Sequence, residues 1–374
     1  METLLFLVGL VGIFGYISSI MGGINTINTM INTAYDLLFN TAFYIMAVAV
    51  LAGALSEILT EFGVIAATNK LLSPIVKPIF GLPGASTIGI LTTYLSDNPA
   101  ILTFANNQQI RRYFKKYQLP ALTNIGTAFG MGLIVSAAVA GMAPEGESFL
   151  TAVLIGNVAA IVGALVSTRL MLIASAKKYG KEADCEVEGD SDYDILNYRE
   201  VRTGGVGSRL MSAALDGGGA GVQLGIDIIP GILIITTLVL MLTNGTGAVG
   251  VYDGSAYQGI GLLPMLGEKI NFILKPMFGF QNVEAIAVPL TALGAAGAAV
   301  GIIPEMIANG IANTHDIAVF VAMCMCFSGY LCTHVVMMES LDEKDLILPA
   351  ILSHTVGGLC AGVAANLMFN FFVG

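Results

Sequence analysis

The sequence has few charged residues and few cysteines. Only 11% of its 374 residues are charged, whereas 55% are hydrophobic and the mean hydropathy is +0.80. Soluble domains carry about 25% charged residues, so this composition cannot cover a folded chain of this length with a water-facing surface. The five cysteines form no disulfide framework, and the absence of a basic region argues against nucleic-acid binding. What remains is an all-α polytopic membrane protein.

Long apolar segments give the expected membrane spans. A bilayer core needs roughly 20 apolar residues per helix. The first segment is interpreted as a retained N-terminal helix, because its start, Met-Glu-Thr, lacks the positive residue of a signal peptide. The seven expected spans are Thr3–Met21, Thr41–Leu59, Leu119–Met142, Phe149–Ala174, Val222–Leu242, Ile317–Met338 and Leu346–Phe372.

Two further apolar stretches are interrupted. Gly81–Phe104 contains Pro83 and then Ser96–Pro99, and Phe280–Pro304 contains Gly294–Gly297. Interrupted segments are tolerated at membrane depth only when they are buried in protein or line a wet cavity. We interpret both as re-entrant hairpins; kinked spanning helices are the alternative.

The two interrupted stretches are copies of each other. Ile75–Leu82 matches Ile273–Phe280 at an offset of 198 residues, with Lys-Pro-x-Phe-Gly in both. The match continues without a gap to Ala100 and Ala298. Each copy holds three spanning helices and a hairpin, and the odd number turns the second copy upside down. Inverted repeats with broken helices indicate a secondary transporter with a midplane site. A duplication without transport is the alternative.

Four regions follow from this arrangement. The linker is placed in the cytoplasm, because all but Lys269 and Lys275 of the 16 basic residues then fall inside. Gly217–Gly221 is interpreted as a flexible joint. The regions are 1–40, a transmembrane helix and an interfacial amphipathic helix that starts near Ile24; 41–174, the first repeat; 175–220, an acidic cytoplasmic linker; and 221–374, the inverted second repeat.

Amphipathic helix, Pro-x-Phe-Gly turn, broken hairpin and helix pair together resemble the gate (nucleoside-recognition) domain. That domain is shared by concentrative nucleoside transporters, the ferrous-iron permease and the spore-maturation membrane proteins. Leu37–Leu172 most resembles the spore-maturation type, through Leu71–Val76. The resemblance implies two gate units, roughly Ile31–Ile173 and Gly221–Phe372, whose hairpins meet near the midplane. The Gly-Gln-Ser/Thr-Glu signature of nucleoside carriers is missing, so nucleoside as substrate is not implied.

Polar residues inside apolar segments are the candidate site. Asp97 is the strongest, because it lies at the predicted tip of hairpin one between Ser96 and Asn98. These oxygens could bind Na⁺, a proton or a cationic solute, or Asp97 is an N-cap of the second arm. The second tip, at Gly294, offers only backbone groups and close approach.

The helix after each hairpin adds further candidates, and either helix could be unwound at the site. In the second copy Tyr330 and His334 share a face, and Ser328 adds a kink. For Asn124 and Ser328, helix–helix hydrogen bonding is the alternative. The full set of candidate solute- or ion-binding residues is Ser96, Asp97, Asn98, Thr123, Asn124, Thr127, Gly294, Ser328, Tyr330 and His334.

The sequence therefore predicts a secondary transporter for a small polar solute, nucleoside-like solutes included, coupled to Na⁺ or H⁺. We expect no resident cofactor, a bacterial inner-membrane location, and a small molecule or ion and the lipid bilayer as partners; a homo-oligomer is compatible with this. No His-Glu-x-x-His or Gly-x-Ser-x-Gly motif indicates an enzyme. One alternative is a transition-metal permease, because Cys324, Cys326, Cys332 and His334 crowd one helix. Another is a membrane partner protein that does not transport.

Overall fold

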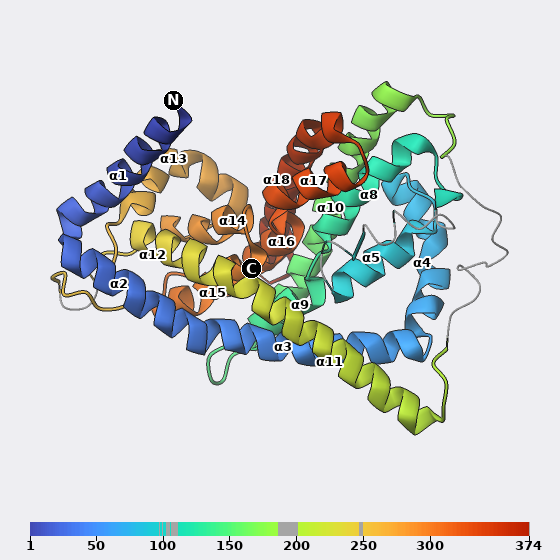
Figure 1. Cartoon of the computed structure of the whole chain (residues 1–374), viewed down its shortest axis with the longest axis horizontal. Helices are drawn as coiled ribbons and strands as arrows, with labels where there is room; N and C mark the ends of the chain where they lie inside the picture. The colour runs from blue at the N-terminus through green and yellow to red at the C-terminus, as the bar shows by residue number, and fades with distance from the viewer. Residues whose placement is uncertain are drawn as a thin grey trace.

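The structure is a computed structural model that describes residues 1–96, 98, 100–101, 105, 111–185, 201–246 and 250–373. The elements of secondary structure within these residues are α-helices and short 3-10 or π-helical turns (Figure 1). In chain order they are α1 (Glu2–Met21), α2 (Gly23–Asp36), η1 (Leu37–Ala42), α3 (Phe43–Glu61), α4 (Val64–Phe80), α5 (Ser86–Leu95), η2 (Lys116–Gln118), α8 (Leu119–Ala128), α9 (Gly132–Ala140), α10 (Leu150–Tyr179), α11 (Val206–Gly231), η3 (Ile232–Thr236), α12 (Thr237–Thr243), α13 (Leu262–Phe278), η4 (Val283–Ile286), α14 (Ala287–Ala292), α15 (Ala296–Ala308), α16 (Thr314–Phe327), α17 (Tyr330–Ser340), η5 (Lys344–Leu346) and α18 (Ile347–Phe372).

Five helical runs in the described part of the chain are long and apolar enough to cross a membrane. They are Glu2–Met21, Gly23–Glu61, Lys116–Ala140, Leu150–Tyr179 and Lys344–Phe372. Shorter apolar helices, among them both hairpin regions and α16, accompany them. The chain is an all-α polytopic membrane protein, as the composition predicts.

The duplicated motif ends a helix in both copies. α4 and α13 each have 17 residues, and their bounds differ by the same 198 residues as the sequence match. Each ends at a left-handed glycine, Gly81 at φ 79° and Gly279 at φ 72°. Glycine adopts this conformation without a Cβ penalty, which explains why Lys-Pro-x-Phe-Gly closes both helices. α4 lies at the right edge of the molecule and α13 at its left end (Figure 1).

The last helices of the two repeats, α10 and α18, cross at glycines. A Cβ on Gly163 would lie 2.7 Å from the Gly357 carbonyl oxygen, and one on Gly357 would lie 2.6 Å from that of Gly163. Four residues further along α10, Ser167 meets His354, which precedes Gly357, so the helices are antiparallel. Equivalent helices in reciprocal antiparallel contact are the arrangement expected of inverted repeats.

α3 and α11 form a second antiparallel crossing, and here the expectation of a flexible joint is wrong. Gly217 and Gly221 lie inside α11, which already begins at Val206, within the expected linker. A Cβ on either glycine would overlap the backbone of α3 at Gly53 or Ala49. Small residues let two helix backbones approach closely, so the glycine run is a helix–helix contact.

α2 differs from the expected interfacial helix, because it continues through the π-helical turn η1 into α3. Its polar side packs on protein: the Asn25 amide donates to the Tyr252 carbonyl (2.8 Å) and the Asn32 amide to the Gly254 carbonyl (2.9 Å). Its isoleucines face outward; Ile24 is 78% exposed. The threonine and asparagine repeat therefore binds the loop that precedes α13.

Two of the expected spans are each divided into two helices. Leu119–Met142 becomes α8 and α9, with Met131 at φ 56°, and Ile317–Met338 becomes α16 and α17, with Ser328 at φ 42° and Gly329 at φ 70°. Left-handed backbone at non-glycine residues is uncommon and directs attention to functional sites. The unwinding expected at the site is therefore present in both repeats.

Candidate functional site

The two helix breaks touch each other at the centre of the molecule. The Ser328 hydroxyl lies 3.3 Å from the Gly130 carbonyl oxygen, and these two residues are 198 positions apart. Equivalent residues of the two repeats therefore meet where the repeats face each other. Because both helices are unwound there, backbone groups are freed from helical bonds, as at other helix ends.

The tip of hairpin one binds to the break in the second repeat. The Asn98 amide donates to the Ser328 carbonyl (2.6 Å), and the Ser328 hydroxyl donates to the Asn98 Oδ1 (3.0 Å). A Cβ on Gly130 would overlap that same Asn98 oxygen, so only glycine admits the tip. Ser96 is different: its hydroxyl donates to the Thr92 carbonyl of its own helix (2.7 Å).

The tip of hairpin two binds the same break with backbone groups. The Gly329 amide donates to the Ala292 carbonyl (2.8 Å), and a Cβ on Gly329 would lie 3.0 Å from the Gly294 oxygen. This agrees with the expectation that the second tip contributes backbone and close approach. Both hairpins thus converge on Ser328 and Gly329.

A buried hydrogen-bonded chain connects the two repeats beside this centre. The Asn124 amide donates to the Ser167 hydroxyl (2.9 Å), which lies 3.1 Å from Nδ1 of His354. His354 Nε2 donates to the Cys326 carbonyl, in the last turn of α16 before the break. Nδ1 is then the acceptor for the Ser167 hydroxyl. The Asn124 amide also donates to the Ala350 carbonyl (3.0 Å). For Asn124 the structure therefore gives the helix–helix role.

Tyr330 and His334 lie in the same buried region. The Tyr330 ring stacks on His354 at 5.0 Å between centroids, and the His334 ring meets His354 at 4.8 Å. His334 is 0% exposed, and neither of its ring nitrogens has a hydrogen-bond partner in the part of the chain that the structure describes. Thr127 contacts the Met337 sulfur (3.9 Å), whereas Thr123 bonds locally to the Pro120 carbonyl (2.8 Å) and is not directed at the breaks.

Two tyrosines occupy related places in the repeats, a feature that the sequence analysis missed. The Tyr94 hydroxyl donates to Asn157 in α10 (2.9 Å), and the Tyr330 hydroxyl lies 2.6 Å from Thr355 in α18. Asn157 and Thr355 are 198 residues apart, although the first tyrosine comes from a hairpin arm and the second from a broken helix. The offset between their partners is the signal that could have identified Tyr94.

Asp97, the strongest candidate from the sequence, lies outside the described residues. In the described part of the chain, no three His, Cys, Asp or Glu side chains are grouped so that they could hold a metal ion. Cys324 and Cys326 are buried free thiols on α16.

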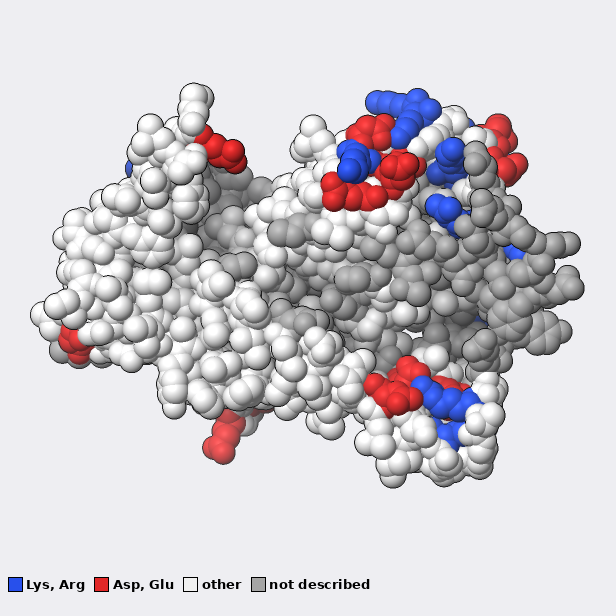
Figure 2. Space-filling model, in the orientation of Figure 1, with Lys and Arg blue, Asp and Glu red and all other residues white. Residues whose placement is uncertain are grey.

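Figure 2 shows most of the visible charged side chains in two patches in the right half of the molecule, one at the top and one at the bottom. Two groups of ion pairs are present, and in one of them Arg202 pairs with Glu57 (2.7 Å) and Glu61 (3.0 Å). Lys178 pairs with Glu343 (2.8 Å) and Asp345 (2.6 Å), which connects α10 to the turn after α17.

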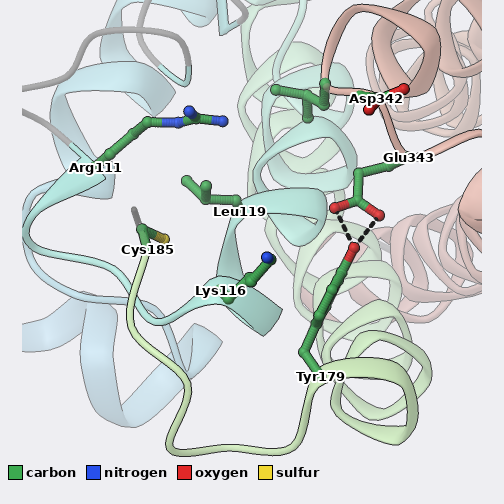
Figure 3. Close-up of a pocket in the computed structure, with 8 residues that line it drawn as sticks. Arg111, Lys116, Leu119, Tyr179, Cys185, Asp342 and Glu343 are labelled. Atoms are coloured by element: carbon green, nitrogen blue, oxygen red, sulfur yellow. Dashed lines mark hydrogen bonds between the residues drawn. The ribbon is translucent and has the colours of Figure 1, made fainter. Parts of the chain in front are cut away.

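A polar cavity of about 260 Å³ adjoins this second cluster. Figure 3 shows Arg111 and Lys116 pointing into it opposite Glu343, which accepts from the Tyr179 hydroxyl. Burial raises the pKa of the Cys185 thiol at its edge. Its lining residues are Arg111, Lys116, Leu119, Tyr179, Cys185, Leu341, Asp342 and Glu343. α8 begins and α17 ends here, so both helices run from the central breaks to this cavity.

An apolar cavity of about 400 Å³ lies on the other side of the first hairpin arm. α4, α5, Phe129 and Ile161 form its walls, and Tyr94 closes it toward the tip. The arm that carries Asn98 is therefore not packed tightly on this side.

No protein-family model and no curated protein matches the chain. Among solved structures, the chain is similar to CNTnw, a concentrative nucleoside transporter. In its inward-facing substrate-bound state the TM-score is 0.56 at 16% identity, covering 100% of this chain and 85% of that one. For a variant in an outward-facing state the TM-score is 0.57 at 15% identity, covering 99% and 86%. An intermediate state of a variant gives 0.56 at 16% identity, covering 100% and 86%. The chain therefore has the fold of these structures.

Proposed function

We propose that this protein is a secondary transporter that moves a small polar solute across the membrane, coupled to a cation. The observation that carries the proposal is the contact between two equivalent helix breaks, at Gly130 and Ser328, with both hairpin tips bound to them. Broken helices from inverted repeats that meet in the protein interior are the recurring construction of secondary-transporter sites.

The site fits a polar solute because it combines freed backbone groups with hydroxyl and amide side chains. Asn98 and Ser328 each offer one donor and one acceptor, and at present these satisfy each other. A solute with adjacent donor and acceptor groups would replace that pairing without leaving either group unsatisfied. Asp97 would add the negative charge next to Asn98 that attracts a cation or cationic group.

Movement of the first hairpin arm is the step that would open the site. The arm ends at Asn98 and adjoins the apolar cavity beside Tyr94, which leaves it room to shift. CNTnw has been solved in structures described as outward-facing, intermediate and inward-facing states. A similar cycle in this protein would make and break the Asn98–Ser328 contact.

We infer the orientation from charge. Most of the Lys and Arg side chains visible in Figure 2 lie in the right half of the molecule, in an upper and a lower patch. Since positive residues are retained on the cytoplasmic side, we place this half and the linker there.

The function is tested by uptake into proteoliposomes. The panel contains uridine, adenosine, free nucleobases, amino acids, and Fe²⁺ and Zn²⁺, each under Na⁺ and pH gradients. We expect saturable uptake of one polar solute, abolished in Asn98→Ala and retained in the neighbouring control Ser96→Ala, whose hydroxyl donates to the Thr92 carbonyl of its own helix. Uptake of a metal ion alone would favour the permease, and no uptake of any member would favour a non-transporting partner.

A further inference from the structure

His334 is a buried polar side chain that makes no hydrogen bond to the described part of the chain. Its ring is 0% exposed, and both nitrogens lack a partner among the described residues. A buried polar group without a partner destabilises the folded state, so such groups in folded proteins call for an explanation. The neighbouring His354, by contrast, has both ring nitrogens bonded, to Ser167 and to the Cys326 carbonyl.

Among the residues that the structure describes, the groups around His334 supply no counter-charge for a proton. α18 presents His354 to it, and Tyr330 lies on the same helix 6.0 Å away between ring centroids. α16 contributes the Cys326 thiol, which lies near Tyr330. α8 has no titratable side chain. The charged residues of η5, Lys344 and Asp345, pair with Glu339 and Lys178 at the end of the molecule. Within the described residues, no carboxylate is bonded to His334.

We propose that His334 is the proton-binding residue of the transport cycle, so that the coupling ion is H⁺. This inference rests on the proposed function. In the closed conformation the imidazole stays neutral, because burying an imidazolium without a partner is strongly unfavourable. When the break beside it opens to water, the free nitrogen lone pair takes one proton. That proton leaves when the site opens to the other side. A ligand that binds the two conformations unequally is what drives a change between them.

The position of His334 supports a path for the proton. It lies on α17, between the central break at Gly329 and the polar cavity at Leu341. A single helix thus connects the solute site to the charged end of the molecule.

Comparison of the repeats singles out the same residue. The equivalent of His334 at the 198-residue offset is Ser136, whose hydroxyl accepts a hydrogen bond from the Asn157 amide (2.8 Å). Where the first repeat has a hydrogen-bonded serine, the second has a histidine without a bond to the described residues, and histidine can carry a proton. This difference also supplies the test substitution, His334→Ser, which restores a side chain that this fold already accepts.

The direct test is the protonation state of the three histidines, followed by NMR with isotope-labelled histidine in lipid nanodiscs. His334→Ser and His315→Gln assign the signals; His315 is the matched control, because it bonds Asn366 and Asp316 away from the breaks. We expect the His334 signal of the wild-type protein to change from neutral to protonated as the pH falls. A His334 signal that stays neutral at every pH would overturn the proposal.

The second test separates coupling from solute binding. A pH gradient supports up to about tenfold accumulation per pH unit when one proton accompanies each solute. For the panel solute that the wild type moves, we expect His334→Ser to lose this accumulation but to retain solute exchange, and His315→Gln to retain both. Unchanged pH-driven accumulation in His334→Ser, accumulation driven only by Na⁺, or loss of exchange would each contradict the inference. If no solute moves but His334 titrates, the transport function fails and the proton site stands.

Discussion

At the scale of single residues, the tightest point of the candidate site is the approach of Asn98 to Gly130. Gly130→Ala would place a methyl group on the Asn98 oxygen. We expect a loss of about 1–3 kcal/mol of stability, as for other overpacked sites, together with loss of transport. Thermal unfolding in detergent measures the first effect.

The control for this substitution is Gly219→Ala, at a glycine of α11 where a Cβ meets nothing within 4 Å. Alanine in a helix interior is favoured over glycine by roughly 0.5–1 kcal/mol, so this variant should be slightly stabilised. Equal unfolding temperatures for the two variants would show that the tip is not seated as described.

Asp97 gives a second prediction at this scale. Asp97→Asn keeps the size and the capping ability of the side chain but removes its charge. An ionised carboxylate at membrane depth is energetically costly and typically marks an ion or substrate pathway. We therefore expect transport to fall strongly while the protein still inserts. Uptake with unchanged pH and Na⁺ dependence would leave Asp97 as a helix cap only.

At the scale of elements, the hydrogen bonds from Asn124 through Ser167 to His354 connect α8 and α10 to α18 and α16. Ser167→Ala leaves the buried His354 Nδ1 without its partner, which is expected to lower stability by about 1–3 kcal/mol. Ser175 on the same helix is buried, and its hydroxyl has no partner. Ser175→Ala should therefore be neutral or slightly stabilising, and thermal unfolding of both variants compares them. A similar loss of stability in both variants would mean that the hydrogen bonds from Asn124 to His354 make no specific contribution to stability.

Element types were easier to predict than element contacts. Apolar length predicts helices, and the offset predicts where α4 and α13 end, because both signals lie in consecutive residues. The glycine run at Gly217 was misinterpreted, since glycines in a flexible joint and glycines at a helix crossing have the same composition. Only the distant partner, Gly53, distinguishes them.

The candidate site was predicted in part for the same reason. Asn98 and Ser328 are hydrogen-bonded, and Gly294 lies against Gly329; these positions could be named from the sequence because hairpin tips and helix breaks are marked by local turn residues. Their role in binding stays a prediction. Tyr94 was missed: its role depends on a hydrogen bond to Asn157, 63 residues away, and its counterpart in the second repeat lies on another element.

At the scale of the whole molecule, the orientation in the membrane can be tested by labelling. In a background with Cys185→Ser, cysteines are introduced as Asp190→Cys in the linker and Asp253→Cys before α13. A membrane-impermeant maleimide added to intact cells should label position 253, on the side to which only two of the basic residues are assigned, and leave position 190 unlabelled. Permeabilised cells, in which both should react, provide the control. External labelling of position 190 alone would reverse the assigned orientation.

The antiparallel crossing at Gly163 and Gly357 also bears on how such a chain arose. A half-length ancestor with this contact would pair with its own copy, and residues near the axis would face themselves. Gly163, for example, lies against Ala361, its own equivalent at the 198-residue offset, so one codon would then have set both sides of that contact. Fusion of two copies frees each side to change alone, as at Gly130 and Ser328 or Ser136 and His334. Differences between the copies close to the axis therefore mark positions where the two repeats could take on separate roles after duplication.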